Sequence, residues 1–233
     1  HKSMYGAATD GPSVRAARAR LETEQVARIK GAKTAGEAIS ALIPLGNVGK
    51  DSVTYPPRAL AMAWVKAKRA GVLNDKLTDH QASSSGYLAN TSEAYGGGDA
   101  HSSTVKQALM RMAAAAGKTS GLVPAMSRDV DADLTPGEPQ KHREHVKTLL
   151  DVLGSTKGGD ESRLAAAREA QRVVEKIGAG GVPKRNFLGG SSGYGFYGSP
   201  DDSKPLSKYL AEQVEALENR KASAAAAAAK ETA

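Results

Sequence analysis

Apolar positions recur every three to four residues in six stretches of the chain, which is the period of an amphipathic helix. These stretches lie at 12–30, 57–70, 102–116, 139–153, 160–177 and 203–221. No stretch shows the strict apolar–polar alternation of a half-buried strand. The segments 78–104 and 178–203 are instead rich in Gly and Ser, and loops of that length are usually functional segments or linkers. The pattern predicts a mainly α fold with long Gly/Ser-rich loops.

Short sequence motifs recur along the chain in the same order. Tyr-Gly at Tyr5, Tyr95 and Tyr197 is followed by small and acidic residues, a Ser or Thr, and a helical stretch. The first two helical stretches end in GAKTAG and GKTSG, which fit a glycine helix stop. Leu-Ile-Pro at 42–44 and Leu-Val-Pro at 122–124 follow, and then the proline-flanked helix starts before 57–70 and 139–153. SSGY recurs at 84–87 and 191–194, just ahead of the next Tyr-Gly.

Five elements in one order indicate an internal duplication. We therefore divide the chain into repeat 1 at 1–94, repeat 2 at 95–196, and a partial third repeat at 197–233 that holds one helix and an Ala-rich tail. A repeated unit usually repeats a packing or binding task. Because catalysis seldom needs the same site twice, the duplication favours a binding protein.

The composition predicts a small core. Leu, Ile, Val and Phe together supply 39 of 233 residues, about 17%, whereas Ala supplies 41. Since alanine buries little area, we expect extended, weakly cored helical segments that order against a partner. The net charge of +7 and the pI of about 9.5 favour acidic partners, which include acidic proteins and nucleic acid.

The absence of cysteine excludes disulfides, thiolate metal sites, Cys nucleophiles and thioether-linked cofactors. No stretch approaches the ~20 apolar residues of a membrane span, so we expect no membrane insertion. The chain begins at His1. We interpret the chain as a processed or truncated product, consistent with the loss of a targeting peptide.

Three short motifs imitate known sites. The G-x-G-x-x-G at 193–198 has no strand before it and a polar run after it, which leaves a flexible loop or an interaction loop. Gly117-Lys118-Thr119 lacks the first glycine of a phosphate loop, because Met112 stands there. His142 and His145 lie three apart, but a metal needs further ligands, so a solvated basic face is favoured. No G-x-S-x-G elbow is present, and we predict no enzyme activity.

Candidate partner-binding residues are aromatic or basic. Four of the ten aromatic residues fall between Phe187 and Tyr197 on a glycine-rich frame, which suits interface anchors. Trp64 lies on a basic helix, where core packing and docking on an acidic surface both remain open. The candidates are Tyr5, Arg58, Trp64, Lys66, Arg69, Tyr87, Tyr95, Phe187, Tyr194, Phe196 and Tyr197.

The three Tyr-Gly segments and the two SSGY loops resemble the linker proteins of red-algal phycobilisomes. The resemblance implies a plastid protein of the stroma, associated with thylakoids after its transit peptide is removed. It implies a structural linker that bridges acidic phycoerythrin or phycocyanin rings, and contacts other linkers, through repeated basic helices and aromatic–glycine loops. Without cysteine, such a linker has no covalent cofactor, and any bilin near it belongs to its partners.

A second function stays open. The basic residues could meet phosphate, which predicts a nucleic-acid-binding subunit of an organellar ribosome or another nucleoprotein. The sequence carries no RNA-recognition signature, and no run of Lys and Arg is longer than two.

Overall fold

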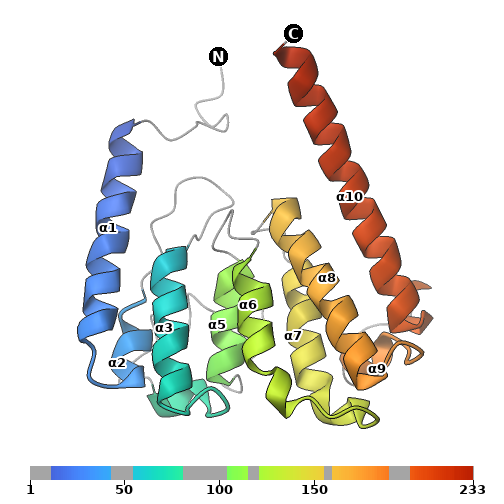
Figure 1. The fold of residues 1–233 in the computed structure, drawn as a ribbon, viewed down its shortest axis with the longest axis horizontal. Helices are drawn as coiled ribbons and strands as arrows, with labels where there is room; N and C mark the ends of the chain where they lie inside the picture. Colours follow the sequence, from blue (N-terminus) through green and yellow to red (C-terminus); the bar gives the residue numbers. More distant parts are fainter. Residues whose placement is uncertain are drawn as a thin grey trace. The chain divides into compact units, whose positions relative to one another are not determined.

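The structure, a computed structural model, describes residues 12–42, 55–80, 104–114, 121–154, 159–188 and 200–232. These ranges are mainly helical and contain no strand, which confirms the mainly α part of the prediction (Figure 1). The chain divides into two compact units, 1–119 and 120–233. We describe each unit by itself.

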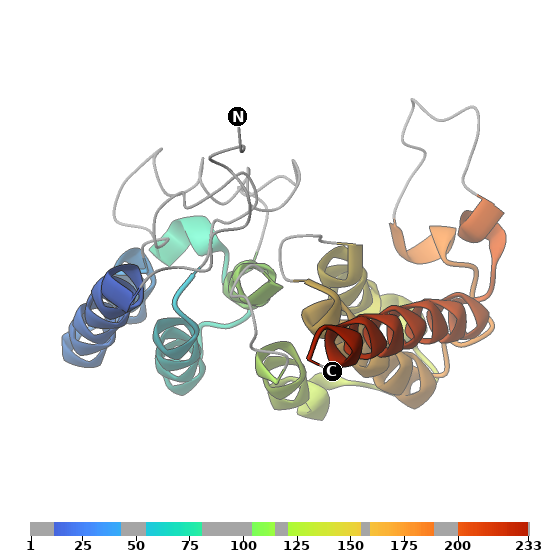
Figure 2. The ribbon, with the colours of Figure 1, turned by 90° about the horizontal axis from the view of Figure 1, so that it is seen from above.

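Unit 1 is built around one central helix. It holds α1 (Pro12–Gly31), α2 (Ala35–Ser40), α3 (Pro57–Arg69), the short 3-10 helix η1 (Leu77–His80) and α5 (Val105–Ala114). Helix α3 packs against α1, α2 and α5, and it lies between α1 and α5 (Figure 2). Thr34 caps α2 by accepting a hydrogen bond from the Glu37 backbone N–H. Pro57 opens α3, where its missing N–H costs nothing.

Unit 2 is likewise built around α8. It holds α6 (Leu122–Asp129), α7 (Arg143–Gly154), α8 (Gly159–Ile177), α9 (Arg185–Leu188) and α10 (Leu206–Glu231), with the 3-10 helices η3 (Asp131–Asp133), η4 (Pro139–His142) and η5 (Pro200–Ser203). Helix α8 packs against α6, α7 and α10.

Both units bury more apolar surface than the composition led us to expect. Leu60, Leu109 and Ile39 in unit 1 are fully buried, as are Leu149 and Phe187 in unit 2. Alanines fill the helix contacts beside them: Ala59, Ala63 and Ala67 on α3, and Ala166, Ala167 and Ala170 on α8. Small side chains let helix axes approach closely, so the alanines that the composition discounted are part of the core. The expectation of weakly cored segments therefore needs correction for the described residues.

The predicted helix bounds were accurate where proline or glycine marks them. The stretches 57–70 and 160–177 became α3 and α8 with ends shifted by one residue, whereas 139–153 splits into η4 and α7. The sequence did not predict α2 or the short α9, and it misjudged two further regions. Leu122-Val123-Pro124 lies inside α6 rather than after a helix, because a proline in the first turn forfeits no intrahelical bond. Helix α10 continues past 221 to Glu231 through the alanine run.

A compact turn after α3 fixes the start of α5, and we call it the turn clamp. Gly71 ends α3 in the left-handed region with φ +71°. The chain then returns to α5 through an antiparallel bridge between Lys76 and Thr104. Four backbone hydrogen bonds hold this turn, from Val72 N to Ala67 O (3.1 Å), Asp75 N to Val72 O (3.0 Å), Val105 N to Asp75 O (2.9 Å) and Lys106 N to Leu73 O (3.0 Å).

The same turn clamp joins α8 to α10 in unit 2. Gly178 has φ +73°, and Pro183 and Pro205 form the bridge. The corresponding bonds run from Ala179 N to Val174 O (2.9 Å), Val182 N to Ala179 O (3.0 Å), Leu206 N to Val182 O (2.9 Å) and Ser207 N to Gly180 O (3.0 Å). Corresponding residues of the two clamps differ in number by a constant amount on each side of the segment that the clamp encloses. The difference is 107 before that segment (72 and 179) and 101 after it (105 and 206).

This correspondence pairs α3 with α8 and α5 with α10. The sequence comparison had paired the α3 stretch with 139–153, which contains α7, and the hydrogen bonds of the clamp do not support that pairing. In sequence, each clamp encloses one SSGY phrase, at 84–87 and at 191–194. Those phrases and the predicted repeat boundaries at 94/95 and 196/197 lie outside the described residues.

Candidate protein-interaction surface

Six of the eleven candidate partner-binding residues lie outside the described ranges, so their role stays a prediction. They are Tyr5, Tyr87, Tyr95, Tyr194, Phe196 and Tyr197. The glycine motif at 193–198 falls there as well.

The two remaining aromatic candidates are core residues. Trp64 is 3% exposed on α3 and Phe187 is 0% exposed on α9. Of the two readings left open for Trp64, the structure supports core packing. Phe187 is likewise covered by its own unit, so the aromatic anchor expected at this position is not on the surface.

Lys66 has an internal partner. Its ammonium group donates hydrogen bonds of 2.9 Å to the carbonyl oxygens of Lys30 and Ala32, at the end of α1. The last carbonyls of a helix lack intrahelical partners, so Lys66 caps α1 and ties it to α3. At the other end of this contact, the Arg58 backbone N–H donates to Glu22 Oε1 at 2.9 Å. Lys66 therefore positions α1, and the exposed Arg58 and Arg69 are the remaining basic candidates.

One side of α3 faces away from the core, and we call it the α3 face. Its residues follow the helical spacing opposite the buried alanines, and they are Arg58, Ala61, Met62, Val65, Lys68 and Arg69. Val65 is 37% exposed, one of two large apolar side chains that stand out among the described residues. Helix α3 contains no acidic residue. The α3 face thus combines cations with an exposed aliphatic centre.

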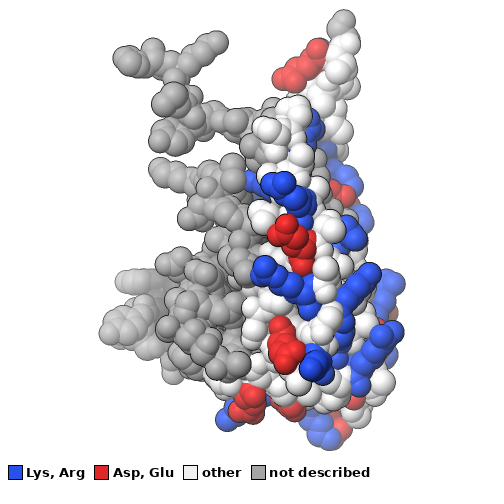
Figure 3. Space-filling model, turned by 90° about the vertical axis from the view of Figure 1, so that its left-hand side faces the viewer, with Lys and Arg blue, Asp and Glu red and all other residues white. Residues whose placement is uncertain are grey.

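The net charge is divided unevenly between the units. Unit 1 contains 16 Lys and Arg against 9 Asp and Glu, whereas unit 2 contains 16 of each. The whole charge of +7 therefore belongs to unit 1. Figure 3 faces the side that carries α1 and shows Lys and Arg gathered there, with fewer Asp and Glu between them.

In unit 2, acidic neighbours neutralise the cations on the corresponding side of α8. Arg172 donates to both carboxylate oxygens of Asp131 on η3, at 2.8 and 2.9 Å, and also contacts Glu169. Lys176 lies 3.6 Å from Asp131. The hydrogen bond from Arg172 lowers the pKa of Asp131 against the opposing effect of burial, and the two carboxylates raise the pKa of Arg172.

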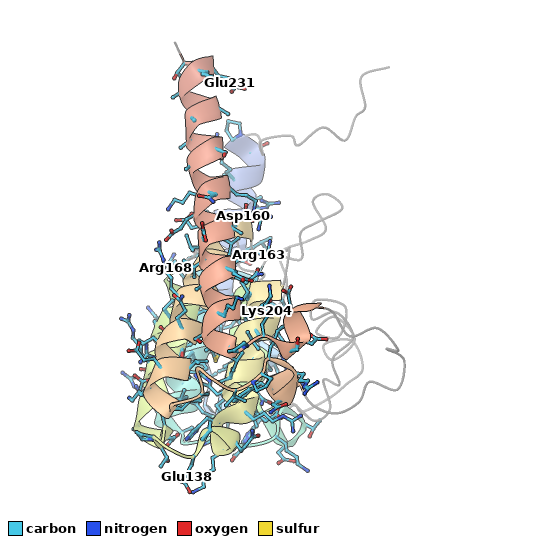
Figure 4. The ribbon with its side chains drawn as sticks, turned by 90° about the vertical axis from the view of Figure 1, so that its right-hand side faces the viewer. Glu138, Asp160, Arg163, Arg168, Lys204 and Glu231 are labelled. Atoms are coloured by element: carbon cyan, nitrogen blue, oxygen red, sulfur yellow. The ribbon has the colours of Figure 1, made fainter. Side chains whose placement is uncertain are left out.

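Further ion pairs join α8 to α10. Arg168 Nη2 lies 2.5 Å from Glu218, and Arg220 Nε lies 3.5 Å from Asp160. Figure 4 labels Arg168 and Asp160. Helix α10 buries only Leu206, Leu210 and Leu217, and every residue from 218 to 232 is exposed. Helix α10 therefore continues well beyond its contact with α8.

The two histidines do not form the solvated basic face that the sequence favoured. His142 Nε2 accepts a hydrogen bond of 2.7 Å from the Thr135 backbone N–H, and His145 Nε2 lies 3.0 Å from Ser127 Oγ. Both are buried, with 9% and 7% exposure. Because Ser127 is 0% exposed, no substrate could reach this Ser–His pair as it stands, and we assign it to packing. The described ranges contain no group of three residues that could hold a metal ion.

Comparison with protein-family models, curated protein sequences and solved structures found no match. Among the described helices, none combines the length and apolar character that crossing a membrane requires.

Proposed function

We propose that this protein is a structural linker of a large pigment–protein complex of the phycobilisome type, where it joins acidic phycobiliprotein subunits. The single observation that carries the proposal is the turn clamp, which occurs once in each unit with the same hydrogen bonds. A linker needs two binding elements on one chain, and a recurring clamp supports that arrangement.

The clamp gives each enclosed segment a fixed base. In unit 1 the bridge between Lys76 and Thr104 brings together two residues that are 28 positions apart; in unit 2 the bridge between Pro183 and Pro205 joins residues 22 apart. Closing a loop costs conformational entropy, and in this fold the hydrogen bonds of the clamp already hold the two ends together before a partner binds. A segment closed at its base loses less freedom on binding, which strengthens the contact it makes.

The sequences enclosed by the clamps have the residues of interface anchors. Each holds an SSGY phrase and a later Tyr-Gly, with Tyr87 and Tyr95 in the first and Tyr194 and Tyr197 in the second. Tyrosine offers large contact area at low conformational cost, and glycine allows close approach of the partner backbone. Two such segments on one chain bind two subunits with avidity set by their tether.

The proposal is tested by removing the anchors one segment at a time. We expect the pair Tyr87→Ala and Tyr95→Ala to remove one partner subunit from the reconstituted particle, and the pair Tyr194→Ala and Tyr197→Ala to remove the other. Native mass spectrometry counts the subunits. An unchanged subunit count in both pairs, with the helical signal intact, would count against two equivalent binding segments.

The uneven charge favours a second candidate function, a nucleic-acid-binding subunit of an organellar ribosome or nucleoprotein. All of the net positive charge belongs to unit 1. Phosphate binding by such a unit would weaken steeply with salt, by about a thousand-fold or more between 50 and 200 mM for six or more contacts. Release of the protein by nuclease would select this function over the linker.

A further inference from the structure

We infer that the α3 face docks on an acidic protein surface, with Val65 at the centre of the contact and Arg58 and Arg69 beside it. The inference rests on the proposed function only in taking the partner to be a protein. It concerns unit 1 alone, and it assigns a binding surface among the described residues, separate from the enclosed segments discussed above.

The corresponding side of α8 indicates what covers such a surface. Under the correspondence set by the turn clamp, Val65 and Arg69 match Arg172 and Lys176. In unit 2 both matched cations pair with one carboxylate, Asp131, which the short η3 segment presents. In unit 2 the acidic η3 segment therefore covers this side of α8, whereas the corresponding Val65 and Arg69 of unit 1 are exposed.

The sequence directly before α3 adds no net negative charge to the α3 face. The segment that connects α2 to α3, residues 43–54, contains one Lys and one Asp, so its net charge is zero. Helix α3 contains no acidic residue, and its Arg58 and Arg69 are exposed on the same side as Val65. Lys30 and Lys33, at the end of α1 that Lys66 ties to α3, are exposed as well. Carboxylates of a partner protein would complement the charge of the exposed Arg58 and Arg69.

The mixture of side chains fits a protein better than a nucleic acid. Met62 is half-buried and Val65 is 37% exposed between the cations. A phosphate backbone would leave these apolar atoms in water, and the bases would find no aromatic side chain on the α3 face to stack on. Protein interfaces, in contrast, commonly combine a buried apolar centre with Arg and a polar rim.

Zero-length cross-linking of the native particle tests where the surface docks. A carbodiimide joins a lysine amine directly to a carboxylate, so we expect links from Lys68 and Lys30 to Asp or Glu of another protein. Links from these lysines only to Asp51 of the same chain would overturn the inference. The inference would also be overturned if these lysines formed no cross-links to protein and nuclease treatment dispersed the particle.

Matched variants then test the energetics. We expect Arg58→Gln with Arg69→Gln to weaken binding to the cross-linked partner subunit by about ten-fold at low salt, with less effect at high salt. The control pair, Arg185→Gln with Lys208→Gln, removes the same charge from exposed positions of unit 2 and should change affinity less than about two-fold. Equal losses in the two pairs would show that only net charge matters and would overturn the docking site.

The outcome also separates this inference from the proposed function. A coloured particle whose cross-links avoid the α3 face would retain the linker function and overturn the docking site. Cross-links from the α3 face to a protein without bilins would support the docking site and contradict the phycobilisome assignment.

Discussion

Replacing Gly71 with alanine tests the turn clamp directly. Gly71 has φ +71°, and nothing lies within 4 Å of the position that a Cβ would occupy. The cost is therefore the backbone cost of placing alanine in the left-handed region, about 1–2 kcal/mol. Alanine recovers up to about 1 kcal/mol by restricting the unfolded chain. We expect a net loss of about 1 kcal/mol, or about 4 °C in the melting temperature of unit 1.

The assay compares three variants by thermal denaturation, with hydrogen exchange to show which unit opens. Gly178→Ala should destabilise unit 2 by the same amount, because its φ is +73° and its Cβ position is also open. Gly31→Ala is the control, since Gly31 has equally open space without a left-handed backbone. If Gly71→Ala were as stable as Gly31→Ala, the left-handed turn and the clamp built on it would be refuted.

Three further substitutions have defined outcomes. Burial raises the pKa of Tyr55 to about 12, and its buried hydroxyl has no hydrogen-bond partner among the described residues. An unfolded tyrosine ionises near pH 10, so unit 1 should lose about 2–3 kcal/mol as the pH rises from 10 to 12, and Tyr55→Phe should abolish that loss in denaturation experiments. Gly36→Ala would place its Cβ 2.4 Å from the His80 backbone oxygen and should cost about 1–3 kcal/mol in the same melts. Arg172→Met leaves the 4%-exposed Glu169 without its cation and should destabilise unit 2 by about 2–3 kcal/mol, whereas a neutral result would contradict the ion-pair network.

Local signals predicted the helices well because they act within a few residues. The two prolines before Arg58 and the glycine at 71 bracket α3, and the sequence alone placed its ends within one residue. Helix α6 was missed because the sequence comparison placed Leu122-Val123-Pro124 in a connection after a helix, although proline is tolerated in a first helical turn. The end of α10 was missed because the alanine run, set aside as a tail, has the highest helix propensity of any residue type.

Tertiary relations were harder to predict than helices. The match of α3 with α8 has few identical residues, chiefly Ala59 with Ala166, Ala63 with Ala170, and Gly71 with Gly178. The backbone hydrogen bonds that define it leave little trace in the sequence. The charge pattern did point to α3, but it could not show that Lys66 turns inward to the end of α1.

The aromatic candidates show the same limit. Phe187 stands in a glycine-rich stretch that is typical of exposed loops, yet α9 places it in the core. The exposure of Val65 was not predicted, because a valine next to Trp64 in a helical pattern is as consistent with a buried position as with an exposed one. Side-chain direction depends on which neighbours a helix acquires, and a single sequence does not specify them.

The size and absorption spectrum of the native particle that carries this chain test the linker account most directly. The particle would be isolated in concentrated phosphate, which strengthens apolar contacts, and then treated with nuclease. The account predicts a large coloured particle with bilin absorption that survives the nuclease. A colourless particle that nuclease disperses would contradict it and would assign the charge of unit 1 to phosphate binding.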